Sequence, residues 1–206
     1  MKKNFKNKKV LITGHTGFKG SWLTVWLKHL GAEIMGISID LPSKPSHFSA
    51  CKNEKDIKDV RLDITNLKKI KKKIINFKPD YVFHLAAQSL ISRSYYDPIQ
   101  TWKTNLIGTL NLMESLRFLK KKCSVVIITS DKCYYNKELK RGYKEEDELG
   151  GKDPYSASKA AAEILIRAHI KSFFPKEGKI RISTARAGNV IGGGDWSQDR
   201  LIPDCI

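Results

Sequence analysis

The chain alternates between short apolar runs and amphipathic stretches. Consecutive apolar residues, many of them β-branched, predict buried strands, and apolar residues that recur every three or four positions predict helices. The predicted strands cover residues 9–13, 33–39, 60–62, 81–85, 124–129 and 180–185, and the predicted helices cover 18–30, 67–77, 101–119 and 154–173. A further helix is expected to begin near residue 201.

This alternation of strands and helices predicts an α/β fold, a doubly wound parallel sheet (Rossmann-like) with right-handed crossovers. Ligands of such sheets bind beyond the carboxyl ends of the strands. Polar or glycine-rich groups follow five of the strands: Gly14, Asp40, Asp63, 86–88 and 130–132. Because these ends meet at one edge of the sheet, the pattern predicts a single binding site there.

The charge balance is strongly basic, with 38 Lys and Arg against 21 Asp and Glu and a net charge of +17. Nucleic acid is one interpretation of this charge, and a solvated lysine surface is the other. The run 68–73 lies on the outer face of a predicted helix, and no aromatic residue interrupts it. Single-strand binding surfaces interleave aromatic with basic residues, so we expect no nucleic-acid partner.

The remaining composition favours a cytoplasmic protein of one domain, or of one domain and a remnant of another, since 206 residues with 41% hydrophobic content can bury a core. No apolar run is long enough to cross a bilayer, and the first residues do not form a signal peptide, so no membrane partner is expected. The four cysteines are scattered without metal-ligand spacing, which predicts reduced thiols and no metal site.

The turn after the first strand has the pattern Gly-x-x-Gly-x-x-Gly, at Gly14, Gly17 and Gly20. Dinucleotide sites use such glycines for a tight turn, for close approach to pyrophosphate and for helix packing. The helix that begins at Phe18 would direct free N–H groups at the phosphates. A glycine-rich turn without a ligand is the alternative interpretation.

Asp40 lies about 20 residues further on, where a carboxylate binds the ribose 2′-hydroxyl of NAD. It would repel a 2′-phosphate, so NAD is favoured over NADP, although Lys44 nearby keeps NADP open. Asp63 and Ile64 could flank the adenine, unless Asp63 is only a helix N-cap. Further cofactor contacts are expected in the same turn and at the ends of the fourth and fifth strands: Thr16, Lys19, Leu85, Ala86, Ala87 and Thr129.

Tyr155 and Lys159 are four residues apart on a predicted helix that Asp153 caps, so both side chains can face one ligand. The Lys159 ammonium would favour the phenolate of Tyr155 by lowering its pKa. A phenolate placed this way can take a proton from a sugar hydroxyl. Together with the glycine turn, this pair predicts a nicotinamide-dependent enzyme.

With these residues the chain resembles the extended short-chain dehydrogenase/reductase family, in the turn 14–20, the segment 84–88 and the Tyr-x-x-x-Lys pair. Within that family it resembles the CDP-glucose 4,6-dehydratases over essentially its whole length. The segments that carry this likeness are 14–20, 129–134, 150–155, 186–196 and 199–204. Three positions depart from the family pattern: Ser89, Ser92 and Tyr135.

The resemblance implies conversion of CDP-glucose to CDP-4-dehydro-6-deoxyglucose, with NAD taking a hydride from C4 and returning it to C6. Tyr155 would remove the O4 proton, Lys159 would bind the nicotinamide ribose, and Ser130 or Thr129 would hydrogen-bond O4. Asp131 would be the acid at O6 and Lys132 the base at C5, or the group that orients it. An ordinary Asp–Lys ion pair is the alternative for those two residues.

The resemblance also implies substrate contacts, with Asn189 and Arg200 at the diphosphate and Gln88 and Asn136 near the hexose. It divides the chain into an NAD-binding domain, 1–187, and the start of a sugar-nucleotide region, 188–206, whose remainder is expected to be absent. The helices 101–119 and 154–173 are expected to pair in a homodimer. An epimerase, a simple dehydrogenase and an inactive NAD-binding chain are the competing functions.

Overall fold

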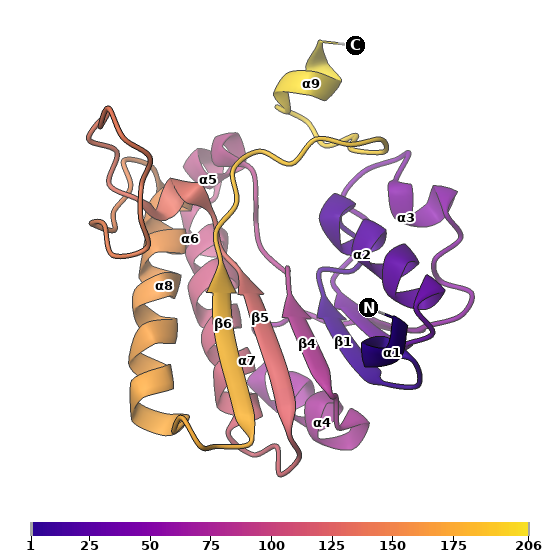
Figure 1. The fold of residues 1–206 in the computed structure, drawn as a ribbon. Coiled ribbons are helices and arrows are strands. Elements are labelled where there is room, and N and C mark those ends of the chain that lie inside the picture. Colours follow the sequence, from indigo (N-terminus) through magenta and orange to yellow (C-terminus); the bar gives the residue numbers. More distant parts are fainter. Residues whose placement is uncertain (1, 206) are drawn as a thin grey trace.

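A computed structural model describes residues 2–205 and shows a six-stranded parallel sheet with the strand order β3-β2-β1-β4-β5-β6 (Figure 1). The strands are β1 Lys9–Thr13, β2 Glu33–Ser38, β3 Lys58–Arg61, β4 Tyr81–His84, β5 Cys123–Ile128 and β6 Ile180–Ala185. All six predicted strands are confirmed, with small shifts at their ends. The strand order reverses between β1 and β4, which is where ligands bind to sheets of this type.

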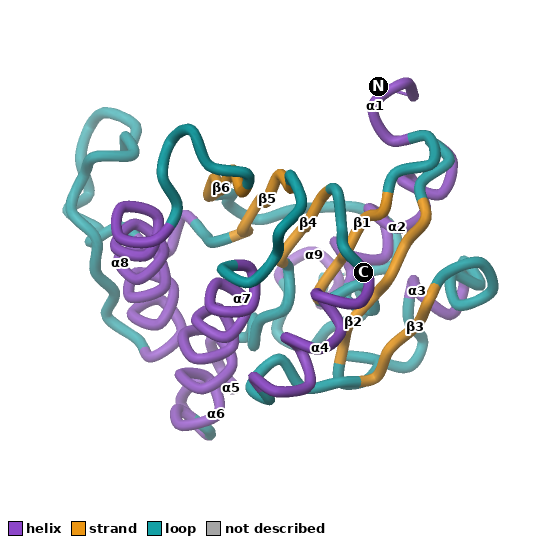
Figure 2. Tube along the Cα trace, turned by 90° about the horizontal axis from the view of Figure 1, so that it is seen from below, coloured by secondary structure: helices purple, strands orange, loops and turns teal. Residues whose placement is uncertain are grey.

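Helices cover both faces of the sheet, with α2 and α3 on one face and α4, α7 and α8 on the other (Figure 2). The predicted bounds of α4 and α8 are confirmed. None of the helices in residues 2–205 is both long and apolar enough to span a membrane. The helices are α1 Lys2–Phe5, α2 Phe18–His29, α3 His47–Ala50, α4 Leu67–Phe77, α5 Ile91–Tyr96, α6 Pro98–Trp102, α7 Gly108–Leu116, α8 Pro154–Phe173 and α9 Leu201–Asp204.

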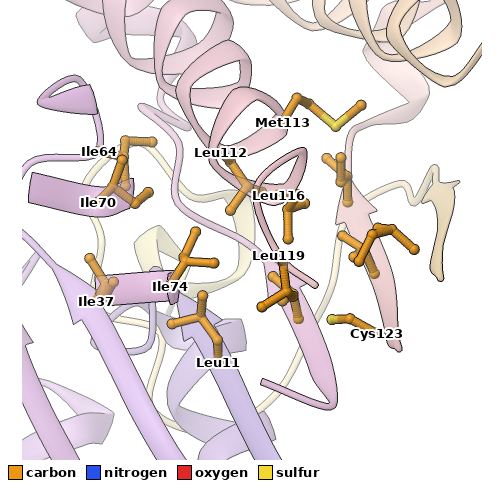
Figure 3. Close-up of a cluster of buried hydrophobic side chains, with 14 of the residues drawn as sticks. Leu11, Ile37, Ile64, Ile70, Ile74, Leu112, Met113, Leu116, Leu119 and Cys123 are labelled. Atoms are coloured by element: carbon orange, nitrogen blue, oxygen red, sulfur yellow. The ribbon is translucent and has the colours of Figure 1, made fainter. Parts of the chain in front are cut away.

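The core forms on both faces because successive residues of a strand point in opposite directions. Leu11 joins the larger cluster, which packs the sheet against α4, α7 and α8 (Figure 3). Val10 and Ile12 join the smaller cluster with Leu27 of α2. The central strand is thus buried on both sides, which explains its unbroken apolar sequence.

The predicted helix 101–119 differs from the structure. It begins earlier, at Pro98, because Asp97 accepts a hydrogen bond from the Gln100 N–H at 3.0 Å and caps α6. A π-helical turn, Lys103–Ile107, then separates α6 from α7. No sequence pattern indicated this turn, and such turns occur frequently at functional sites.

The segment after β6 runs across the carboxyl edge of the sheet toward α2 and α3, and then returns to end in α9 (Figure 1). The predicted helix at residue 201 is confirmed as α9. Ile206, the last residue of that predicted element, lies outside the described residues. The division of the chain at residue 187 stays a prediction.

Candidate active site

The glycine turn takes a shape that side chains would not allow. Gly14 has a φ of +76°, and a Cβ added there would lie 2.6 Å from the Ala86 nitrogen. A Cβ on Gly20 would lie 2.1 Å from the Gly14 carbonyl oxygen. Gly17 is the N-cap of α2 and no side chain caps it, so the first N–H groups of the helix remain available to an anion. This cradle fits the pyrophosphate of a dinucleotide.

Thr16 and Asp40 meet beside the turn. The Thr16 hydroxyl donates to the Asp40 carbonyl oxygen at 2.7 Å, and the Asp40 carboxylate is exposed at the end of β2. Asp63 accepts from the Thr65 N–H at 2.8 Å, whereas the N-cap of α4 is Asn66. The N-cap alternative for Asp63 is therefore wrong. The Ile64 side chain lies in the core, and the Ile64 carbonyl accepts a hydrogen bond from the Asn111 amide at 3.0 Å.

The loop after β4 is held by backbone and side-chain hydrogen bonds. Leu85 N–H donates to the Thr13 carbonyl at 2.9 Å, and Ala86 N–H to the Thr13 hydroxyl at 3.3 Å. Ala87 follows them, half-buried. The Gln88 amide is used within the loop, because it donates to the Leu90 carbonyl and to Thr101 and accepts from the Leu90 N–H. Gln88 therefore shapes the site wall.

Asn105, in the π-helical turn, is a residue that sequence reasoning missed. It accepts from the Gln88 N–H at 2.9 Å and donates to the Gln88 carbonyl at 3.0 Å. Its amide also donates to the Ser158 hydroxyl at 2.9 Å, between Tyr155 and Lys159 of α8. The only sequence signal was an asparagine inside a predicted helix, where that residue type is unfavourable.

His84 extends this buried polar network beneath the loop. Its Nδ1 lies 2.6 Å from the Thr13 hydroxyl and its Nε2 lies 3.1 Å from that of Thr109. Thr109 already donates to the Asn105 carbonyl at 2.7 Å, so Nε2 of His84 carries the proton and donates to Thr109. Burial lowers the pKa of His84 to about 3, which keeps the ring neutral.

Tyr155 and Lys159 lie together inside the protein, both nearly buried. Burial lowers the pKa of Lys159 to about 8, and the charge of Lys19 acts in the same direction. Burial raises the pKa of Tyr155, while its hydrogen bond with Ser130 opposes the rise. The expected lowering by Lys159 is therefore not observed. Desolvation is the stronger effect on the phenol, and the Lys159 ammonium instead donates to the Ile128 carbonyl at 3.5 Å.

Thr129 and Ser130 have different partners, although they are neighbours at the end of β5. The Thr129 hydroxyl donates to Glu163 at 2.6 Å, within a buried pair in which Arg186 Nε donates to the same carboxylate at 3.0 Å. Burial acts to raise the pKa of Glu163, but these hydrogen bonds outweigh it and the pKa is lowered. Of the two hydroxyls, Ser130 is the one beside Tyr155.

Asp131 and Lys132 lie on a short 3₁₀ turn, Asp131–Cys133, with both side chains exposed. The Asp131 carboxylate accepts from the Ser130 hydroxyl at 3.1 Å, so it lies beside the phenol of Tyr155. Among the ion pairs of residues 2–205, none joins Asp131 to Lys132, so the ion-pair alternative has no support. Two side chains of different chemistry remain available at the strand end.

The predicted substrate residues are not all brought together. Arg200 lies close enough to act on the pKa of both Tyr155 and Lys19. Asn189 is exposed on the segment after β6, and Asn136 is held in the loop after the 3₁₀ turn, where it accepts from Tyr143 at 2.9 Å. Asn136 lines a groove of about 1070 Å³ between that loop, α8 and β6, which reaches the site at Asp131 and Lys132.

Lys19, in the first turn of α2, lies close enough to interact with the charges of Lys159 and Asp131 in the site. Burial lowers the pKa of Lys19, and Arg200 lowers it further, while Asp131 and Asp195 act against them. These charges come from three separate segments of the chain: α2, the turn after β5 and the segment after β6. Within residues 2–205, no cluster of three His, Cys, Asp or Glu side chains could hold a metal ion.

A family model described as GDP-mannose 4,6 dehydratase matches residues 11–183, from the first strand to β6. The chain belongs to this dehydratase family. It is 46% identical over 209 residues to a CDP-glucose 4,6-dehydratase of Salmonella typhimurium strain LT2, an alignment that covers 99% of the chain and 58% of that relative. The chain thus spans little more than half the length of this relative.

Two solved structures of similar fold are epimerases. The epimerase Mth375 of Methanothermobacter thermautotrophicus has a TM-score of 0.84 and 26% identity, over 98% of this chain and 58% of that one. A UDP-glucose 4-epimerase of Thermus thermophilus, determined as a complex with NAD, has a TM-score of 0.76 and 28% identity. It covers 89% of this chain and 56% of that one. These likenesses confirm the Rossmann-like fold predicted for this dehydratase-family chain.

Proposed function

We propose that the chain forms the NAD-binding part of an enzyme that dehydrates CDP-glucose to CDP-4-dehydro-6-deoxyglucose. The observation that carries this proposal is the convergence of Ser130, Asp131 and Tyr155 at the carboxyl end of β5. The likeness to the Salmonella dehydratase supplies the substrate, since the nucleotide base of a sugar nucleotide cannot be inferred from these side chains.

NAD is the proposed cofactor because the residues present fit it. The glycine cradle and the free N–H groups at the start of α2 would hold the pyrophosphate. The exposed carboxylate of Asp40 would bind the adenosine ribose and would exclude a 2′-phosphate. When bound, NAD accepts a hydride from C4 of the sugar and later returns it to C6.

The side chains at the end of β5 would move the protons. Tyr155 would take the O4 proton, and Ser130, which hydrogen-bonds that phenol, would hold the same oxygen. The protonated Lys159 would bind the nicotinamide ribose. Oxidation at C4 makes the C5 proton acidic. Lys132 would remove that proton or orient the group that does, and Asp131 would protonate the leaving hydroxyl at C6.

The diphosphate of the substrate would bind Arg200. Its Nε is buried and has no hydrogen-bond partner among the described residues, while a carboxylate oxygen of Asp195 lies 3.9 Å away. A buried guanidinium nitrogen left this way favours an anionic ligand. Asn189 is proposed as a second contact on the same segment, and Asn136 as a contact to the hexose.

We further propose that the enzyme is cytoplasmic and acts as a homodimer. Large apolar side chains are exposed on α5, α6 and α8, which pack against one another: Tyr96 is 90% exposed, Ile99 67% and Ile164 58%. Exposed apolar groups gathered on adjacent elements mark interaction surfaces. Pairing of these helices with a second copy would bury them.

Mass spectrometry of CDP-glucose incubated with the purified chain and NAD tests the proposal. We expect a product lighter by one water from CDP-glucose, and no such product from dTDP-glucose or GDP-mannose run in parallel. An isomer of unchanged mass would indicate an epimerase, and reduced NAD with an oxidised sugar would indicate a simple dehydrogenase. The NAD content of the same sample shows whether the cofactor site is formed.

A further inference from the structure

The segment after β6 is fastened on both sides of the site that it crosses, and Figure 1 shows its path from β6 over the strand ends. We call residues 188–200 the strap. On one side, its glycines 192–194 lie on α2 and α3. On the other side, Asp199 accepts a hydrogen bond from Ser92 of α5, and Arg200 donates to the Ser89 hydroxyl at 3.2 Å.

The contact with α2 and α3 centres on Trp22 and His47. The Trp22 indole N–H donates to the Gly193 carbonyl at 3.0 Å. The indole stacks on the His47 ring with a centroid separation of 4.3 Å. His47 is held from beneath, because its Nδ1 lies 2.6 Å from the Ser21 hydroxyl and its Nε2 lies 3.4 Å from the Cys51 sulfur.

The glycines explain how the strap fits against this pair. Gly194 has a φ of +85°, and a Cβ added there would lie 2.7 Å from the His47 ring. A Cβ on Gly192 would lie 3.2 Å from the Phe18 ring, whereas one on Gly193 would meet no atom within 4 Å. The close approach of the strap to the His47 ring therefore requires a glycine at position 194, whereas position 193 tolerates a side chain.

We propose that Trp22 and His47 are positioning residues that hold the strap in place over the carboxyl edge. Asp195 and Arg200 lie on the strap, and the charges of both act on Lys19 of α2. Trp22 is three residues beyond Lys19 on the same helix, so one element carries the cofactor turn and the fastening of the strap. By holding the strap, Trp22 and His47 would also place Arg200 for substrate binding. This consequence rests on the proposed function, which assigns Arg200 to the diphosphate of the substrate.

Amide hydrogen exchange of the full chain tests the fastening without any need for activity. Gly194→Ala is expected to increase exchange in residues 188–200 by about tenfold, since it removes several contacts at once. Gly193→Ala is the matched control and keeps the wild-type rates. Equal rates in the two variants would overturn the proposal.

A second pair of variants isolates the hydrogen bond. Trp22→Phe keeps an aromatic ring beside His47 but lacks the N–H donor, and Trp26→Phe makes the same change one turn along α2. We expect faster exchange of the strap by about fivefold in Trp22→Phe alone. Wild-type exchange in Trp22→Phe, measured with unchanged overall stability, would contradict the role of the indole.

Calorimetric titrations with CDP-glucose and with NAD distinguish a displaced strap from a general disruption of the fold. Gly194→Ala is expected to weaken CDP-glucose binding by about tenfold, while NAD affinity stays unchanged. Equal weakening of both ligands, or of neither, would refute a positioning role. If the wild-type chain bound no CDP-glucose, the proposed function would fail, and the exchange comparison would still decide whether Trp22 and His47 hold the strap.

Discussion

Lys159 is a buried cation, and the burial of its charge lowers the stability of the fold. Its pKa in the folded protein is about 8, below the ordinary value of 10.5, so burial disfavours the charged form. The unfolded chain binds more protons between these two values, and stability should therefore rise as the pH increases from about 8 to about 10.5. A buried lysine that lowers the stability of the fold in this way is a candidate catalytic or cofactor-binding residue.

Replacement of this lysine should therefore separate stability from function. We expect Lys159→Met to raise the free energy of unfolding at neutral pH by on the order of 3 kcal/mol, since about 1.4 kcal/mol accompanies each pH unit between the two pKa values. The variant should also lose dehydration. Urea denaturation at pH 7 measures the first effect, and a less stable variant would show that its partners compensate the charge.

Lys132 is expected to matter for the reaction and not for the fold. It is exposed, and Lys132→Met should leave stability and NAD binding unchanged while it lowers dehydration of CDP-glucose by about 10²- to 10⁴-fold, as loss of a general base does. Single-turnover mass spectrometry measures the loss of water. Lys140→Met, an exposed lysine of the following loop, is the control, and full activity in Lys132→Met would remove this residue from the mechanism.

At the scale of elements, the π-helical turn connects the loop after β4 with α8. Asn105→Ala would leave the half-buried N–H and carbonyl of Gln88 without their partner, which should cost about 1–3 kcal/mol of stability. Hydrogen exchange should also become faster in residues 86–90. Thermal denaturation checks the cost, with Lys103→Ala on the exposed side of the same turn as the control. Equal melting temperatures would show that water replaces the amide.

Most elements could be predicted because their signals are local. The strand at residues 9–13 is predicted from its own apolar sequence, without knowledge of its neighbours in the sheet. The start of α8 is likewise predicted from Pro154 after Asp153 alone. The π-helical turn could not be predicted in this way, because it contains Asn105, whose hydrogen bonds to Gln88 form only in the folded protein. The start of α6 is different: Asp97 before Pro98 is the same local signal as at α8, and the prediction of 101–119 overlooked it.

In the candidate site, too, some features could be predicted from the sequence and others could not. Gly14, Tyr155 and Lys159 were recognisable from spacing. Gly14 follows β1, Lys159 donates to the carbonyl of Ile128 at the end of β5, and Tyr155 lies beside Ser130 just beyond that end. The pKa of Tyr155 was predicted in the wrong direction, because desolvation cannot be read from a sequence. The partner of Thr129 was also unpredictable, since Glu163 and Arg186 are distant in the chain and meet only in the folded protein.

At the scale of the whole molecule, three buried histidines should make the protein sensitive to acid. Burial lowers the pKa values of His15, His47 and His84 below 6.5. The unfolded chain then binds more protons below pH 6.5, so stability should fall as the pH decreases from about 6.5 toward 3, by up to about 1.4 kcal/mol per pH unit for each ring. Urea denaturation at several pH values measures this slope.

A histidine variant identifies the origin of that slope. His84→Gln should remove part of it between pH 6.5 and about 5, where carboxylates still contribute little. His29→Gln, at an exposed position of α2, should keep the wild-type slope. Stability that did not change over this interval would contradict the neutral, buried state of the three rings.

The proposed homodimer is also a property of the whole molecule. Ile164→Lys on α8 should produce monomers, because a charge would then enter the paired helices. Ile39→Lys, at a similarly exposed isoleucine beyond β2, should leave the dimer intact. Sedimentation velocity distinguishes the two states. A wild-type chain that sediments as a monomer would exclude the homodimer.

The four thiols differ sharply in their chemistry. Burial raises the pKa of Cys123 to about 12 and that of Cys133 to about 11, so neither forms much thiolate at neutral pH. Cys51 and Cys205 are exposed. A maleimide dye should consequently label the chain only at these two positions, and a Cys205→Ser variant would carry one dye, at Cys51 beneath His47. Its fluorescence would report, in real time, whether the strap is docked or released.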